Sequence, residues 1–127
     1  MMMARAEKPL RIAIKRAYAA PSPADGMRVL VDRLWPRGLR KSEAAIDRWL
    51  KELAPSTELR QWFGHDPNRW DEFRHRYTAE LKDKTELLGE LRAIAAKGPL
   101  TLVFAARDEQ HNDAVVLRDL LNDNAKR

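Results

Sequence analysis

Three segments of the chain carry the hydrophobic patterns of β-strands. Residues 10–16 alternate apolar and basic side chains, which is the period of a strand with one face in the core. Residues 27–34 contain the run Val29-Leu30-Val31, and residues 100–106 are apolar almost throughout. Consecutive apolar residues are typical of strands that are covered on both faces. The pattern therefore predicts a sheet of three or four strands.

Apolar residues at helical spacing predict helices in the remaining segments. Ser42 is expected to cap a helix that ends before Pro55, with an apolar stripe of Ile46, Trp49, Leu50 and Leu53. A short helix follows Ser56, and a longer one follows Asp66-Pro67, where an N-cap precedes proline at the first helical position. Two further helices are predicted over residues 86–97 and from Asn112 or Asp113 onwards.

The connections between these elements indicate an α/β fold. About sixty residues with helical periodicity join the second and third strands, and a crossover of that kind makes them parallel. The link between the first two strands is short and leaves the direction of the first strand open. We expect a single small domain over residues 10–123, with a mostly parallel sheet of three or four strands packed with about five helices. Residues 1–9 are expected to form a flexible N-terminal tail and residues 124–127 a frayed C-terminus.

Composition narrows the class of protein. The chain has 127 residues, of which 44% are hydrophobic and 34% charged, so one globular domain is expected. It has no cysteine, which excludes disulfides, thiolate nucleophiles and cysteine-ligated metals. No apolar run approaches the roughly 18 residues of a membrane span, so a cytoplasmic protein without a membrane partner is expected. The net charge of +5 attracts anions in general.

Two of the predicted parallel strands end in clusters of charge. Asp32-Arg33 follows the second strand and leads into Trp35-Pro36-Arg37-Gly38, while Arg107-Asp108 and Gln110-His111-Asn112 follow the third. Ligands of open parallel sheets bind beyond the carboxyl ends of the strands. We therefore expect one shallow cleft there. Its candidate catalytic residues are Asp32, Asp108 and His111, and its candidate ligand-binding residues are Arg33, Arg37, Trp35, Asn112 and, if the first strand is also parallel, Lys15.

Each candidate has a chemical role and a structural alternative. Arginines bind phosphate or carboxylate in bidentate fashion, and histidine transfers protons near neutral pH. The aspartates are also consistent with turn caps or ion pairs, and Trp35 with a core residue. His111 is also consistent with a polar residue in a first helical turn, and Asn112 with a helix cap. No metal ligand set with the usual spacing and no phosphate-binding loop is present, so no metal and no cofactor is predicted.

The function favoured by these residues is binding of a small anionic or nucleotide-like ligand at the carboxyl edge of the sheet, with catalysis left open. The alternatives are a protein-interaction module and a protein that associates with nucleic acid through general charge. Basic residues are spread along the chain rather than gathered, so nucleic acid is not expected as a specific partner. The oligomeric state is not indicated.

Three longer motifs resemble a known family. They are Val29-Leu-Val-Asp-Arg-Leu-Trp-Pro-Arg-Gly38, Trp62-Phe-Gly-His-Asp-Pro67 and Phe104-Ala-Ala-Arg-Asp-Glu-Gln-His-Asn112. They resemble the YeaO-like family of small bacterial proteins, part of domain-of-unknown-function group 488, from about Ile12 to Leu121. The resemblance implies an α/β domain and a cytoplasmic bacterial protein but no activity. The wider group tends to carry a Cys-His-Arg element where this chain has Gln110-His111-Asn112, so cysteine chemistry does not carry over.

Overall fold

The fold is built on a parallel sheet. The computed structural model of the chain describes residues 10–125. Within them, a four-stranded sheet consists of β1 (Ile12–Arg16), β2 (Met27–Leu30), β3 (Arg48–Trp49) and β4 (Leu100–Phe104). The spatial order is β1-β4-β2-β3, and every neighbouring pair is parallel. The predicted α/β class is confirmed, and the direction of β1, which the sequence left open, is parallel.

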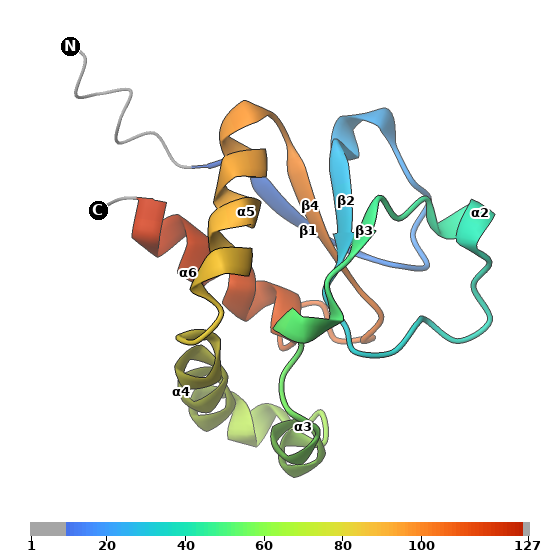
Figure 1. The fold of residues 1–127 in the computed structure, drawn as a ribbon. Helices are drawn as coiled ribbons and strands as arrows, with labels where there is room; N and C mark the ends of the chain where they lie inside the picture. The colour runs from blue at the N-terminus through green and yellow to red at the C-terminus, as the bar shows by residue number, and fades with distance from the viewer. Residues whose placement is uncertain (1–9, 126–127) are drawn as a thin grey trace.

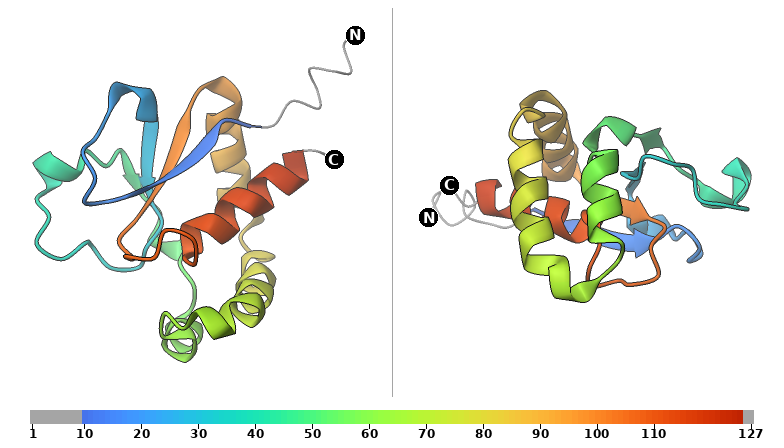
Figure 2. Two further views of the ribbon diagram at one scale, coloured as in Figure 1. Left: turned by 180° about the vertical axis from the view of Figure 1, so that it is seen from behind. Right: turned by 90° about the horizontal axis from the view of Figure 1, so that it is seen from below.

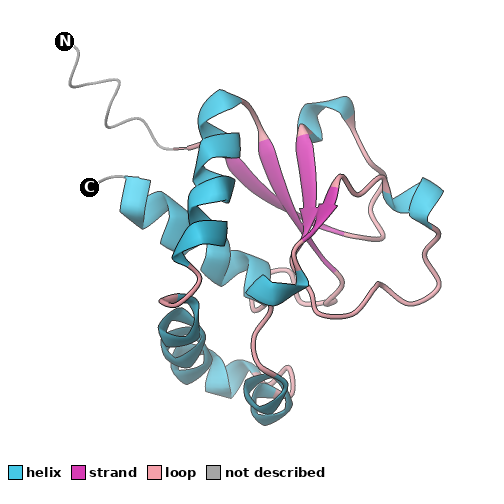
Figure 3. Ribbon diagram, in the orientation of Figure 1, coloured by secondary structure: helices cyan, strands magenta, loops and turns pink. Residues whose placement is uncertain are grey.

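Helices follow β2 and β4 along the chain. They are α2 (Lys41–Ala44), α3 (Thr57–Phe63), α4 (Trp70–Leu81), α5 (Thr85–Lys97) and α6 (Asp113–Ala125), with single 3-10 turns η1 (Pro23–Asp25), η2 (Lys51–Leu53) and η3 (Pro67–Arg69). Figures 1 and 3 show α5 and α6 on one side of the sheet, α2 and its loops on the other, and α3 and α4 below the carboxyl ends of the strands.

Two hydrophobic clusters cover the two faces of the sheet. The larger joins Leu100, Leu102 and Phe104 of β4 to buried side chains of α3, α4, α5 and α6. The smaller joins the alternate residues Leu30 and Val103 to side chains of the connecting loops. One face is thus covered by helices and the other by a thinner layer of loops, which both views in Figure 2 show.

A fully paired group of charges lies on the loop-covered face. Arg28 is 4% exposed, and its guanidinium group donates to Asp25 at 2.6 Å and to the carbonyl oxygen of Ala44 at 2.8 Å. Lys15 also donates to Asp25, at 3.1 Å. We call Lys15, Asp25 and Arg28 the paired cluster. Its hydrogen bonds hold η1 and the end of α2 against the sheet.

The predicted helix is wrong in its cap and in its length, because Ser42 lies inside α2 and the N-cap is Arg40. α2 ends at Ala44, and Ala45 adopts a left-handed conformation with φ of 50°. The chain then forms β3, because the Asp47 N–H donates to the Arg28 carbonyl and the Leu50 N–H to the Leu30 carbonyl. The helical spacing of the apolar residues is coincidental.

The other predicted elements are confirmed with shifted ends. α3 is capped by Ser56, and Asp66 caps η3, which continues into α4. β2 ends at Leu30 rather than Leu34, although the Val31 N–H still donates to the Val103 carbonyl. The expected tail at residues 1–9 and the last two residues of the expected frayed C-terminus lie outside the described residues, whereas the backbone of residues 124 and 125 continues α6.

Candidate functional site

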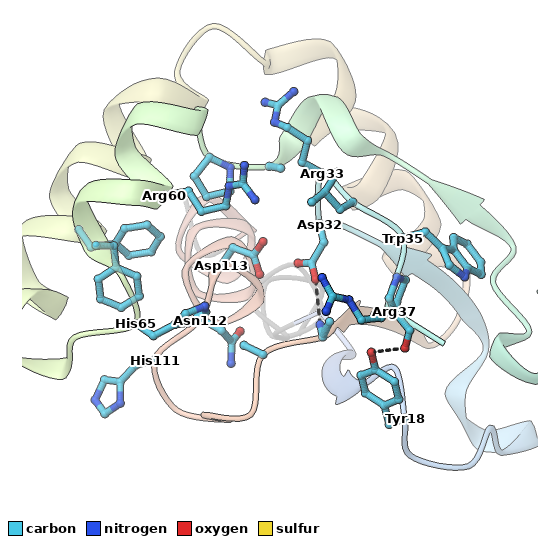
Figure 4. A pocket seen from close by; sticks show the side chains of 18 residues that line it. Tyr18, Asp32, Arg33, Trp35, Arg37, Arg60, His65, His111, Asn112 and Asp113 are labelled. Atoms are coloured by element: carbon cyan, nitrogen blue, oxygen red, sulfur yellow. Dashed lines mark hydrogen bonds between the residues drawn. The ribbon is translucent and has the colours of Figure 1, made fainter. Parts of the chain in front are cut away.

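A cavity of about 320 Å³ lies at the carboxyl ends of β2 and β4. We call it the strand-end cavity. Its walls come from the loop after β2, the loop after β4, the start of α6, and α3 with the residues on either side of it (Figure 4). The polar residues that line it are Tyr18, Asp32, Arg33, Arg37, Arg60, His65, His111, Asn112 and Asp113. The residues that follow β2 and β4 therefore line one cavity, as the parallel topology predicts.

Asp32 lies at the centre of this cavity (Figure 4). One of its carboxylate oxygens accepts a hydrogen bond from the Ala105 N–H at 2.8 Å, and its carbonyl accepts one from the indole of Trp49, also at 2.8 Å. These bonds connect the ends of β2, β3 and β4. The side chain is therefore held in place while it remains partly open to the cavity.

Asp113, the first residue of α6, points toward Asp32. The two carboxyl groups lie near each other in the cavity (Figure 4). Burial raises the pKa of Asp113 well above its usual range, and the neighbouring Asp32 carboxylate raises it further. Two carboxylates this close cannot both ionise cheaply, so Asp113 resists ionisation.

Three arginines line the cavity. Figure 4 shows the guanidinium groups of Arg60, from α3, and Arg37, from the loop after β2, flanking the two aspartates. Arg33 points away from the aspartates and also lines a second cavity of about 290 Å³ beside Glu52 and Glu80.

These arginines are poorly satisfied. The buried Nε atoms of Arg33 and Arg60 have no hydrogen-bond partner among the described residues. None of the ion pairs among residues 10–123 includes Arg33, Arg37 or Arg60. Buried donors normally have partners, so these are exceptions that call for a cause.

Trp35 and Tyr18 shape the rim of the cavity. The Trp35 indole donates to the Leu39 carbonyl at 2.6 Å, and its ring meets Trp49 edge-on at 5.6 Å between centroids. The Tyr18 hydroxyl donates to the Arg37 carbonyl at 2.9 Å (Figure 4). The loop that carries Arg37 is therefore held by a hydrogen bond within the loop and by one from Tyr18.

The polar side chains of the loop after β4 bond mainly to other groups of the same loop. Asp108 accepts from the Gln110 N–H at 2.9 Å and contacts the His111 ring at 2.8 Å. These hydrogen bonds hold the pKa of Asp108 below its usual range. Asp108 does not line the cavity, and the ring of His111 points away from its centre (Figure 4). Asn112 lines the cavity and caps α6 by accepting from the Val115 N–H.

Lys15 lies away from the cavity. Lys15 is opposite Val103 in the sheet register, on the loop-covered face, and its ammonium group bonds Asp25 in the paired cluster. Tyr18, three residues further along the chain, lines the cavity instead.

Four polar lining residues were not among the predicted site residues: Tyr18, Arg60, His65 and Asp113. His65 follows Gly64, and both have a positive φ, of 57° and 53°. Left-handed histidine is uncommon and often marks a functional position. The sequence shows Gly64 next to His65 after Phe63. It does not show that His65 lies near the strand ends, because that depends on tertiary structure. Among residues 10–125, no cluster of side chains suits a metal ion, and no helix is long and apolar enough to cross a membrane.

Together, the fold and the cavity define a small parallel α/β domain that gathers unpaired charge at the carboxyl edge of its sheet. The chain belongs to the DUF488 family: the family model described as "Inactive DUF488-N3 subclade" matches residues 11–127. The chain is 45% identical over 112 residues to "Uncharacterized protein YeaO" of Escherichia coli, covering 88% of this chain and 97% of that protein. It is 46% identical over 112 residues to "Uncharacterized protein Rv3073c" of Mycobacterium tuberculosis, covering 88% and 94%. No solved structure matches the chain significantly.

Proposed function

We propose that the strand-end cavity binds a small molecule through an anionic group, a phosphate or a carboxylate. The observation that carries this proposal is the state of Arg60: it lines a cavity, its Nε atom is buried, and that atom has no partner among the described residues. A buried guanidinium nitrogen without a partner is costly, and a bidentate anion is a partner that the geometry of the guanidinium group fits.

The charge balance of the cavity supports an anion. Because the pKa of Asp113 is raised, Asp32 and Asp113 carry less than two negative charges between them. Arg37 and Arg60 flank them with two positive charges, and Arg33 lies at the border of the cavity. The local charge is therefore positive, in keeping with the net charge of the chain.

The remaining lining favours a small, partly apolar ligand. Phe63 and Phe73 stack on each other with centroids 4.3 Å apart, and both line the cavity with Pro36 and Pro55. A volume of about 320 Å³ is at the small end of the range for metabolite sites. The ligand is therefore the size of a small metabolite rather than a polymer.

Binding without turnover is the version we propose. The two expected proton-transfer residues on the loop after β4, Asp108 and His111, bond to each other, and the His111 ring points away from the aspartates. The family model that matches this chain describes an inactive subclade, which is in keeping with binding without turnover. Asp32 then positions the ligand through its remaining oxygen.

Thermal shifts with simple anions test the proposal. Inorganic phosphate, ethyl phosphate and propionate are titrated into the wild-type protein and into Arg60→Ala and Arg37→Ala variants. At ten times its Kd, a bound anion adds about 1.4 kcal/mol of stability, which corresponds to roughly 4 °C in Tm. We expect a shift in the wild type and its loss in both variants.

Arg76→Ala is the matched control. Arg76 is half-exposed on α4, where it pairs with Glu72 and stacks on Trp62, and it does not line the cavity. This variant should retain the shift. If no anion raises the wild-type Tm, or if Arg76→Ala removes the shift as fully as Arg60→Ala, the proposal fails.

A further inference from the structure

The aspartate pair sets a limit on which anions suit the strand-end cavity. Asp32 and Asp113 come from different elements, the end of β2 and the start of α6, and both point into the same hollow (Figure 4). Among residues 10–123, no ion pair includes either of them. A ligand group placed beside this pair meets acceptors on both sides.

The surrounding charges narrow the ligand further. Arg60 and Arg37 lie on either side of the pair, so acidic and basic groups alternate across the cavity. A ligand with only negative charge would lie against two carboxyl groups, and one with only positive charge would lie against the guanidinium groups. Opposite charges within one small molecule can satisfy both sets at once.

We propose that the ligand is amphoteric: it carries a protonated nitrogen that bonds Asp32 and Asp113, and an anionic group that bonds Arg60 and Arg37. This inference rests on the proposed function and adds the nitrogen to it. The protonated nitrogen favours the ionised form of Asp113, so Asp113 gives up its proton when the ligand binds. Ammonium hydrogen bonds to carboxylates are charge-assisted and are stronger than those of a neutral hydroxyl.

The volume sets the distance between the two charged groups of the ligand. About 320 Å³ holds a compact molecule, so the nitrogen and the anion are separated by only a few bonds. Phosphoethanolamine and β-alanine have this form. Ethyl phosphate and propionate have the same chain and anion without the nitrogen, and they serve as matched controls.

Isothermal titration of these two pairs tests the inference. We expect each amine to bind at least about tenfold more tightly than its control, the difference typical of one charge-assisted hydrogen bond. In the Asp113→Asn variant, which keeps the size of the side chain, the two members of each pair should bind within about twofold. An Asp108→Asn variant, changed outside the cavity, should keep the wild-type preference.

Proton release gives a second measurement. Binding of β-alanine at pH 7 should displace the proton of Asp113, which makes the observed enthalpy depend on the ionisation enthalpy of the buffer, whereas propionate should show no such dependence. The charged and titratable groups around the pair are Arg60 and His65 near α3, Tyr77 and Glu80 on α4, Arg33 and Arg37 after β2, Tyr18 after β1, and His111 beside α6.

The outcomes separate this inference from the proposed function. Equal affinity for amine and control in the wild type would overturn the amphoteric ligand but leave anion binding standing. An unchanged preference in Asp113→Asn, shown by circular dichroism to be folded, would also overturn it. Absence of binding by all four molecules would overturn both.

Discussion

Two groups of aspartate and arginine side chains lie at the sheet, and they differ in how their charges are satisfied. In the paired cluster, Asp25 accepts hydrogen bonds from Arg28, Lys15 and the Ser22 N–H, and Arg28 also binds backbone carbonyls. In the strand-end cavity, two aspartates face each other, and the nearby Arg60 has a buried Nε atom without a partner. The same residue types thus serve the fold in one place and are left available in the other.

The two groups also respond oppositely to pH. Burial alone would raise the pKa of Asp25, but hydrogen bonds from Ser22, Lys15 and Arg28 bring it below its usual value. The pKa of Asp113 is raised by burial and by Asp32. Asp25 therefore contributes stability above its unfolded-state pKa and loses it in acid, whereas the contribution of Asp113 is present in acid and is lost as the pH rises through its folded-state pKa. Paired charge stabilises this fold at neutral pH, and the charge around the cavity does not.

The largest effect is expected from Asp25→Ala. This change leaves the buried guanidinium of Arg28 without its carboxylate, and breaking a buried pair in this way costs about 3 to 5 kcal/mol. Urea denaturation at pH 7 measures it. Glu72→Ala is the control, because it breaks an exposed ion pair with Arg76 and should change stability little. Similar losses in the two variants would mean that the paired cluster is no more important than a surface pair.

An effect of opposite sign is expected from Asp113→Asn. The wild type loses stability as the pH rises through the raised pKa of Asp113. The amide cannot ionise, so the variant does not suffer this loss. Each unit of such a shift corresponds to about 1.4 kcal/mol, so the variant should be measurably more stable than the wild type at pH 8.

The difference between the two proteins should shrink as the pH falls toward the unfolded-state pKa of an aspartate, where both side chains are neutral. Chemical denaturation at several pH values between about 4 and 8 follows this convergence. A variant that is less stable at every pH would show that the Asp113 carboxylate serves α6 as a helix-terminal charge and does not cost stability.

The paired cluster and the cavity also show what the sequence can predict. β2 and β4 were found because continuous apolar runs need cover on both faces, and four helices were found from their period and caps. Asp32, Arg37 and Asn112 meet because parallel strands end at one edge, which follows from topology alone. Such features depend on short-range pattern and on connection length.

The errors have a common physical origin in tertiary contacts. β3 has two residues and no pattern of its own, and it exists because backbone groups of β2 bind the residues around it. Arg28 adds hydrogen bonds to the carbonyls of Ala44 and Ala45 at the end of α2. Arg60 reaches the cavity because α3 lies below the strand ends, which no periodicity indicates. Lys15 was placed near the strand ends without regard to which face its side chain occupies.

The smallest effect on stability is expected from Arg60→Met. Methionine keeps the apolar stem that packs beside the cavity and removes a guanidinium group whose buried Nε atom has no partner among the described residues. The change in stability should stay within about 0.5 kcal/mol, or be favourable, because the desolvation cost of that group is removed with it. The same substitution at Arg28 should destabilise strongly, since it leaves Asp25 buried and the Ala44 carbonyl without its donor. Thermal and urea unfolding of the two variants side by side measure the contrast.

Equal destabilisation would make Arg60 a structural residue like Arg28, and it would remove the reason for assigning a ligand to the cavity. A neutral Arg60→Met would instead mean that the fold has no need of this guanidinium, which is what a group retained for binding predicts.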